Sequence, residues 1–316
     1  MDYRGLQKAN AKWLLRLFWR DNVETKSFDL SVIVPIGNFP KDKENLRKIC
    51  NRLSHINVEV IFILDSQSTD CTLELEEICR SNFLVDYKVL AANLGNPGAT
   101  RNLGLDFYSR SWVTFWDSDD LPNPIPYLSH AKSVGTSPTI IVGAYVENKL
   151  KISKYSKHLF GENEKHNLEI FSFNPGIWRI IFTKDVVGFS RFSSNSMGED
   201  QEFICKILSK NPKIHFSSEI FYEHCTGSSS SLTGSRLHMP DLSRSIESCY
   251  GILLQAGLFR REILFICLRQ IQTCFKYGEN SAKIFAVLTL IKCIINLKPL
   301  EILYIFRFIY LQVNKV

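Results

Sequence analysis

The sequence predicts an α/β fold with a mostly parallel sheet. Three observations lead to this prediction. Short apolar runs recur through the first part of the chain, each is followed by a segment with apolar residues at helical spacing, and the links between them are short. After about residue 240 the pattern is helical only. We therefore expect an α/β region followed by a C-terminal helical extension.

The predicted elements alternate from residue 30 onwards. Buried strands are expected at 30–34, 58–64, 87–90 and 112–116, and helices at 43–53, from Ser68 onwards and at about 99–108. Further on, we expect a strand at 139–146, a strand or helix at 177–182, a helix at 198–210, short strands at 214–216 and 220–222, and a Ser-rich loop at 226–233. Because parallel sheets bind ligands at the carboxyl ends of their strands, Asp65 and Asp117, which both end strands, are expected to line one site.

The domain prediction has three parts, 1–27, 28–239 and 240–316. The first is read as a basic amphipathic helix with a linker, and the last as basic helices. Residues 1–27 would either contact the surface of a membrane or pack onto the body of the protein. Residues 240–316 would either contact a membrane or form a helical subdomain or dimer interface. No signal peptide and no run of 18 apolar residues is found, so we expect a cytoplasmic protein, peripheral at the inner face of the membrane.

The composition limits the kinds of partner and site. A formal net charge of +6 indicates an anionic partner such as a phosphorylated substrate or acidic lipid. The nine cysteines are odd in number and contain no CxxC pair, which favours free thiols over a disulfide framework or zinc site.

An acidic cluster follows the predicted strand at 112–116. Asp117, Asp119 and Asp120 place three carboxylates within four residues. Such charges repel one another unless a cation neutralises them, and carboxylate oxygens suit Mg²⁺ and Mn²⁺. The alternative is an acidic surface turn.

Five motifs in order carry a resemblance to a known family. They are Ser31-Val32-Ile33-Val34-Pro35, Ile63-Leu64-Asp65-Ser66-Gln67-Ser68-Thr69-Asp70, Asn93-Leu94-Gly95 with Gly98-Ala99-Thr100-Arg101-Asn102-Leu103-Gly104, Asp117-Ser118-Asp119-Asp120, and Gly198-Glu199-Asp200. Over about residues 30–210 the chain resembles the inverting family 2 glycosyltransferases of GT-A fold, whose sheet is Rossmann-like and mixed. Ser66 and Gln67 depart from this pattern, since Asp and Gly are common there.

The resemblance implies a donor site with a divalent metal ion. Asp119 would bind Mn²⁺ or Mg²⁺, Asp117 would lie near the donor's ribose and assist, and His224 would be an additional ligand. Asp120 would either assist at the metal or contact the donor. Asp65 would bind the nucleotide base, although it could instead cap the following helix. The donor-binding set is Pro35, Asp65, Asn93, Arg101, Asp117 and Ser118, with the Arg101 guanidinium pairing with the diphosphate.

The same resemblance assigns the catalytic acids. Asp200 would be the base that takes the proton of the acceptor hydroxyl, and Glu199 would orient the acceptor. Both acids could instead only stabilise the first turn of their helix.

The predicted function is an inverting, metal-dependent transferase of the hexosyl or N-acetylhexosaminyl class. It would move a sugar from a nucleoside-diphosphate sugar, with a UDP-sugar favoured, to a glycan or lipid-linked acceptor in bacterial surface polysaccharide (capsule, O-antigen or similar) biosynthesis; no nucleic acid is expected. One alternative is a nucleotidyltransferase, which would need a Gly-rich phosphate loop with Lys or Arg after the first strand, and residues 35–40 lack one. The other is a non-catalytic, membrane-associated nucleotide-sugar-binding protein.

Overall fold

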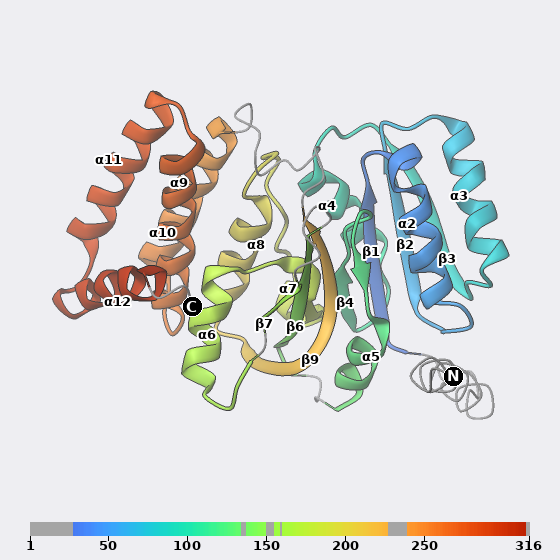
Figure 1. The fold of residues 1–316 in the computed structure, drawn as a ribbon, viewed down its shortest axis with the longest axis horizontal. Helices are drawn as coiled ribbons and strands as arrows, with labels where there is room; N and C mark the ends of the chain where they lie inside the picture. The colour runs from blue at the N-terminus through green and yellow to red at the C-terminus, as the bar shows by residue number, and fades with distance from the viewer. Residues whose placement is uncertain (1–27, 134–136, 150–154, 159, 227–238, 314–316) are drawn as a thin grey trace, which may run out of the picture.

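The computed structural model describes residues 28–133, 137–149, 155–158, 160–226 and 239–313 (Figure 1). The strands in this part are β1 (Leu30–Ile36), β2 (Glu59–Asp65), β3 (Asp86–Ala92), β4 (Trp112–Phe115), β5 (Leu121–Pro122), β6 (Thr139–Lys149), β7 (Tyr155–His158), β8 (Ile180–Thr183) and β9 (Lys213–Thr226). The helices are α2 (Phe39–Arg52), α3 (Thr69–Ser81), α4 (Pro97–Phe107), α5 (Pro124–Ser133), α6 (Glu164–Phe173), α7 (Lys184–Val187), α8 (Glu199–Leu208), α9 (Met239–Gln255), α10 (Arg260–Tyr277), α11 (Asn280–Asn296) and α12 (Ile302–Val313), with 3₁₀ turns η1 (Ile177–Arg179) and η4 (Pro299–Glu301).

The described strands form one mixed sheet, as the predicted α/β GT-A fold requires. Its order is β3-β2-β1-β4-β8-β6-β9-β5, with β7 paired to β6 outside this path. The strands β3, β2, β1 and β4 pair in parallel, whereas β8 runs antiparallel to both β4 and β6, and β9 is parallel to β6. The carboxyl ends of β1, β2, β3, β4, β6 and β9 therefore meet at the same edge of the sheet.

The first strands are apolar throughout because helices cover both of their faces. Val32 and Val34 of β1 pack with Leu46 of α2 in one hydrophobic cluster, while Ile33 packs with Leu105 of α4 in another. Gly104 of α4 permits this second contact, since a Cβ there would lie 2.5 Å from Ile33 Cγ2. Strand β1 is thus the centre of two helix-covered layers.

Three predicted elements differ from the structure. Helix α2 begins at Phe39 rather than residue 43, because Asn38 caps it by accepting the N–H of Lys41 at 3.3 Å and Pro40 lies in its first turn. The segment 177–182 is a 3₁₀ turn followed by β8. The prediction of two separate strands at 214–216 and 220–222 is wrong: both belong to β9, whose pairing with β6 shifts register around Ala144, so the strand continues through the interruption.

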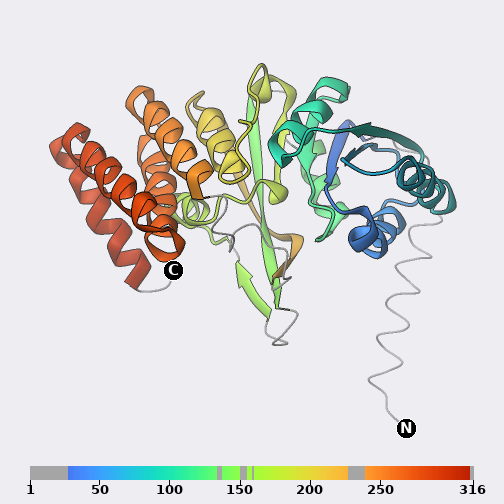
Figure 2. The ribbon, with the colours of Figure 1, turned by 90° about the horizontal axis from the view of Figure 1, so that it is seen from above.

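The helical extension is present and shares the core of the α/β region. Helix α10 contacts α6, α8, α9 and α11. One hydrophobic cluster joins Phe203 of α8 to Leu253 of α9 and Phe265 of α10. Figure 2 shows these last helices at one end of the molecule, opposite α3 and β3. The predictions for 1–27 and for most of the Ser-rich loop, 227–233, lie outside the described residues.

Candidate active site

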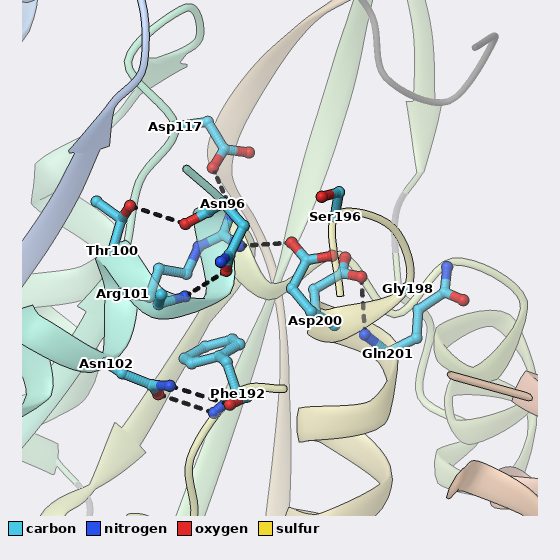
Figure 3. Close-up of polar contacts among 12 residues, drawn as sticks. Asn96, Thr100, Arg101, Asn102, Asp117, Phe192, Ser196, Gly198, Asp200 and Gln201 are labelled. Atoms are coloured by element: carbon cyan, nitrogen blue, oxygen red, sulfur yellow. Dashed lines mark hydrogen bonds and ion pairs between the residues drawn. The ribbon is translucent and has the colours of Figure 1, made fainter. Parts of the chain in front are cut away.

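The residues predicted to form the site lie at the carboxyl edge of the sheet. Asp65 ends β2, Asp117 follows β4 after one residue, and His224 lies near the end of β9. Helix α8 begins at the same place, and Figure 3 shows its Asp200 near Arg101 and Asp117. The fold therefore gathers strand ends and one helix terminus, although these residues are far apart in the chain.

Asp65 holds the loop that leads into α4 by hydrogen bonds. One of its carboxylate oxygens accepts the N–H groups of Leu94 at 2.7 Å and Gly95 at 3.1 Å, and the other accepts the Thr100 hydroxyl at 3.2 Å. The predicted alternative was a cap on the following helix, but these contacts go to α4 and not to α3. Asp65 is 9% exposed, so its carboxylate is held firmly at the strand end.

Gln67 joins the loops after β1 and β2, a role that the sequence did not reveal. Its amide nitrogen donates to the carbonyl of Gly37 at 2.9 Å, and its side-chain oxygen accepts the N–H of Phe39 at 3.3 Å. The neighbouring Ser66 donates to the Asn93 side-chain oxygen at 2.7 Å. The only signal in the sequence was the departure from the family pattern at Ser66 and Gln67.

The acidic loop turns two of its side chains into the protein. The Ser118 hydroxyl donates to Asp42 of α2 at 2.7 Å, and burial raises the pKa of that Asp42 carboxyl. Asn45 of α2 donates to the carbonyls of Ser118 at 3.2 Å and Asp120 at 2.9 Å. Asp42 and Asn45 were missed because nothing in their local sequence distinguishes them from ordinary polar residues of a helix.

Asp120 is held against β9 and not toward the sheet edge. It is 2% exposed, accepts the N–H of Cys225 at 2.7 Å and receives a hydrogen bond from the Tyr222 hydroxyl. The same Tyr222 oxygen accepts the N–H of Asp117 at 2.9 Å. The carboxylates of Asp117 and Asp119 take no part in these contacts with β9.

Burial and the neighbouring charges of Asp117 and Asp119 raise the pKa of Asp120 to about 9. Between the ordinary carboxyl range near pH 4 and about pH 9, the folded state keeps a proton that the unfolded state has lost. The free energy of unfolding should therefore fall as pH rises through this range. In Asp120→Asn this contribution is absent. We therefore expect that the melting temperature of the variant minus that of the wild type, both measured with EDTA, rises from pH 5 to pH 9. Asp70→Asn, at an exposed position of α3, is the control, and parallel curves for Asp120→Asn and wild type would contradict the assignment.

Arg101 connects the acidic loop to α8. Its Nη2 donates to Asp117 Oδ1 at 2.9 Å and its Nη1 donates to Glu199 Oε1 at 2.9 Å (Figure 3). Burial alone would lower the pKa of Arg101, which is 6% exposed, yet the charges of Asp117 and Glu199 raise it above its ordinary value. Both terminal nitrogens donate to carboxylates here, so the structure gives Arg101 a bridging position. Its pairing with a diphosphate stays a prediction.

The position of Arg101 depends on close packing of α4 against the segment before α8. Asn102 and the backbone of Phe192 exchange two hydrogen bonds, of 2.9 and 2.8 Å. At Gly98 a Cβ would lie 2.2 Å from the carbonyl oxygen of Ser193, so only glycine permits this approach. The first turn of α4 is in this way joined to the segment that leads to Glu199 and Asp200.

The C-terminal helices fix the start of α8. Gly198 adopts φ +83° before the helix, and its carbonyl accepts the Ser245 hydroxyl of α9 at 2.8 Å. Asp241 of α9 accepts the N–H of Ser196 at 3.0 Å, and Gln270 of α10 donates to Ser245 at 3.1 Å. The extension is therefore part of the support of the site, a role that sequence patterns did not indicate.

Asp200 has the acid strength of a general base that works near neutral pH. Burial and the charge of Glu199 raise the pKa of Asp200 to about 7, against the opposing effect of Arg101. Its own carboxylate accepts the N–H of Gln201 at 2.8 Å. A base with a pKa near the working pH combines a large deprotonated fraction with strong proton affinity.

The acidic side chains at the sheet edge could bind a divalent cation if a bound substrate supplied the remaining metal ligands. No group of three His, Cys, Asp or Glu side chains in the described part of the chain is arranged to hold a metal ion. Asp119 is exposed at the rim, yet partial burial of its carboxylate and the charges of Asp117 and Asp42 raise its pKa to about 6, which a cation would offset. His224 Nδ1 is buried without a hydrogen-bond partner among the described residues, and burial lowers the pKa of this ring. These donors suit Mg²⁺ or Mn²⁺ with the remaining ligands coming from phosphates.

Comparison with known proteins identifies the family. The model of glycosyl transferase family 2 matches residues 31–196, just over half of the chain. The chain belongs to this family. The match includes the motifs around Asp65, Arg101 and Asp117. It ends before Glu199 and Asp200, so it does not cover these two residues.

Two curated relatives in sequence are named glycosyltransferases. The chain is 27% identical over 216 residues to glycosyltransferase GlyA of Streptococcus pneumoniae, covering 62% of this chain and 30% of GlyA. It is 28% identical over 206 residues to the poly(ribitol-phosphate) β-N-acetylglucosaminyltransferase TarP of Staphylococcus aureus, covering 61% of this chain and 62% of TarP. The chain thus spans less than two thirds of the length of either relative.

A crystal structure of residues 1–349 of Staphylococcus aureus TarS, in complex with UDP-GlcNAc, shares the fold. The TM-score is 0.59 at 20% identity, covering 83% of this chain and 79% of that chain. Without UDP-GlcNAc the same TarS fragment gives a TM-score of 0.57 at 21% identity, covering 78% and 72%. The family 2 chain described here therefore has the α/β architecture of TarS with helices following the sheet.

Proposed function

We propose that the protein is an inverting, metal-dependent glycosyltransferase. It moves a sugar from a UDP-sugar to a hydroxyl group of a glycan or lipid-linked acceptor, reached from the cytoplasmic side of a membrane, in the assembly of a bacterial surface polysaccharide. Membership of glycosyl transferase family 2 supports the reaction class. The choice of a UDP-sugar is supported by TarS, which was solved with UDP-GlcNAc, and by TarP, an N-acetylglucosaminyltransferase.

The observation that carries this proposal is the Arg101 bridge. One guanidinium holds Asp117 of the acidic loop and Glu199 beside Asp200, with both N···O distances at 2.9 Å. The donor side and the base side of the site are in this way fixed relative to each other. Such fixed placement is what the transfer needs, because attacking and leaving groups must lie on opposite faces of the sugar carbon.

In the proposed reaction Asp200 takes the proton of the acceptor hydroxyl as its oxygen attacks the anomeric carbon of the donor sugar. The new glycosidic bond forms while the bond from that carbon to the diphosphate oxygen breaks, and the nucleoside diphosphate leaves with the bonding electrons. Glu199 orients the acceptor hydroxyl, and Asp65 holds the loop at 94–95 beside the donor. Attack opposite the leaving group inverts the configuration at the anomeric carbon.

The negative charge of the leaving diphosphate needs a positive partner. Arg101 is already engaged by Asp117 and Glu199, so its charge is largely offset. Asp119, the free oxygen of Asp117 and His224 would hold Mn²⁺ or Mg²⁺, which when bound neutralises the diphosphate as a Lewis acid. Asp120 would stabilise the position of these metal ligands, because it fixes the acidic loop to β9.

The proposed function is tested by incubating the purified full chain with UDP-GlcNAc, Mn²⁺ and a panel of glycan and lipid-linked acceptors. We expect release of UDP that depends on the acceptor, together with a product of the inverted anomeric configuration by NMR. UDP-galactose and UDP-glucose serve as donor comparisons. Release of GlcNAc-1-phosphate in place of UDP would instead indicate transfer of the nucleotidyl group. No binding or turnover of any UDP-sugar would refute the proposed donor class.

The proposed metal role predicts a strong effect of Asp119→Ala. We expect transfer to fall by about 100-fold or more, because electrostatic stabilisation by a metal ion contributes several kcal/mol. The rise in melting temperature that Mn²⁺ and UDP together produce in the wild type should also be lost. Asp70→Ala is the matched control at an exposed acid. Full activity of Asp119→Ala would remove Asp119 as a metal ligand, and full activity of the wild type in EDTA would show that no metal is needed.

A further inference from the structure

Helix α11 has its large apolar side chains on the outside. The side chains that it buries are small: Ala282, Ala286, Thr289 and Cys293. The large ones, 40–74% exposed, are Ile284, Val287, Leu288, Ile291, Ile294 and Ile295. These positions recur at intervals of three and four residues and therefore form one stripe along the helix. A helix that only packs on a protein core would have the opposite arrangement.

Helix α12, which follows α11 after the turn η4, also exposes large apolar side chains. Leu303, Phe306, Ile309 and Tyr310 are 51–64% exposed, whereas Phe308 and Leu311 are buried against the core. Figures 1 and 2 place α11 and α12 together at the outer end of the molecule. We call the six residues of α11 and these four of α12 the outer apolar face. Monomeric proteins rarely expose so many large apolar side chains in one area, which indicates a contact surface.

The charges around the outer apolar face are basic. Residues 279–313 contain Lys283, Lys292, Lys298 and Arg307, and two acids, Glu279 at the N-cap of α11 and Glu301. Glu301 is 8% exposed and pairs with Arg260 at 2.7 Å, so it presents no charge at the surface. Arg307 pairs with Glu169 at 2.7 Å, which leaves three lysines and the single acid Glu279 as the charges beside the face.

This combination favours a membrane over a second copy of the chain. Two copies that met through this face would bring three lysines of each copy together with only Glu279 to offset them, whereas anionic lipid headgroups would neutralise the lysines. No helix in the described part of the chain is long and apolar enough to cross a bilayer. We propose that α11 and α12 lie on an anionic lipid surface, with the outer apolar face at the level of the acyl chains and the lysines among the headgroups.

Packing contacts connect the proposed docking surface to the candidate active site. Helix α11 packs on α9 and α10, and α9 holds the carbonyl of Gly198 at the start of α8 through Ser245. A lipid-bound α11 would thus place the base-bearing helix at a fixed distance from the bilayer. Removing the whole extension would also remove core residues around α8, so surface substitutions are the appropriate test.

The experiment measures co-sedimentation of the full chain with vesicles of phosphatidylglycerol and phosphatidylcholine, compared with vesicles of phosphatidylcholine alone. We expect preferential binding to the anionic vesicles, weakened by salt. The triple variant Ile291→Ser, Ile295→Ser and Phe306→Ser should bind at least about tenfold more weakly, because each side chain loses apolar burial. The variant Lys283→Gln, Lys292→Gln and Lys298→Gln should lose about fivefold per lysine on anionic vesicles only.

The matched control replaces exposed apolar residues elsewhere on the surface. Leu73, Val85 and Phe189 are 59%, 53% and 101% exposed, and their triple replacement by Ser should leave vesicle binding unchanged. Circular dichroism confirms that each variant is folded. Equal vesicle binding by the outer-face variant and the wild type would overturn the proposal. So would a wild-type dimer in sedimentation equilibrium that the outer-face variant dissociates, in the absence of vesicle binding. Neither result depends on turnover, so this test is separate from that of the transfer reaction.

Discussion

Asp200→Asn is expected to reduce kcat/KM for transfer by about 10²–10⁴-fold while the dissociation constant of the donor stays unchanged. The amide keeps the size of the side chain and its contact with Gln201 N–H, but it cannot accept the proton of the acceptor hydroxyl. The measurement is steady-state transfer together with donor binding by calorimetry in the presence of Mn²⁺. Asp70→Asn, an exposed acid in the first turn of α3, is the matched control and should keep full activity.

The pH dependence provides a second readout of the same role. The pKa of Asp200 is raised to about 7, and only its deprotonated form is a base, so kcat/KM of the wild type should fall as pH drops below about 7. The residual activity of Asp200→Asn should lack this step. Unchanged turnover in Asp200→Asn would remove the residue as the base and leave its carboxylate with only the stabilising effect on the first turn of α8.

Arg101→Met is expected to cause the largest loss of stability, together with loss of transfer. The substitution keeps much of the volume of the side chain but leaves Glu199, which is 6% exposed, without a positive partner. Removing one partner of a buried ion pair costs about 3–5 kcal/mol, and the smaller figure is appropriate here because Asp117 is partly exposed. Urea unfolding monitored by fluorescence measures this loss, and the transfer assay measures the activity.

Two further variants separate the bridge from a general effect of lost charge. Arg80→Met removes an exposed cation, paired to Glu76 at 3.4 Å, and should cost less than about 1 kcal/mol. Adding Glu199→Gln to Arg101→Met should restore part of the stability, because the unpaired buried charge is then gone. If Arg101→Met were no less stable than Arg80→Met, Arg101 would not hold the acidic loop and α8 together.

Local sequence pattern was sufficient to identify the strands and helices from β1 to β4. Apolar runs identified β1, β2, β3 and β4, and helical spacing identified the segments between them, because a strand or helix buried on one or both faces must show that periodicity. The rule that parallel strands end at one edge of a sheet then predicted that Asp65 and Asp117 share that edge. The order of the family motifs then predicted that the two acids at the start of α8 belong to the same site.

The roles of these residues depend on tertiary contacts that the sequence pattern does not contain. Asp120 turns inward because its partner is the N–H of Cys225, 105 residues away, and Arg101 bridges because Glu199 lies 98 residues further on. Chemically similar neighbours such as Asp119 and Asp120 differ only in these distant contacts, which leave no periodic signal in the chain. The exposure of the apolar stripe of α11 also could not be predicted from the sequence. An amphipathic pattern shows which residues share a face of a helix, but only the tertiary structure decides which face is covered.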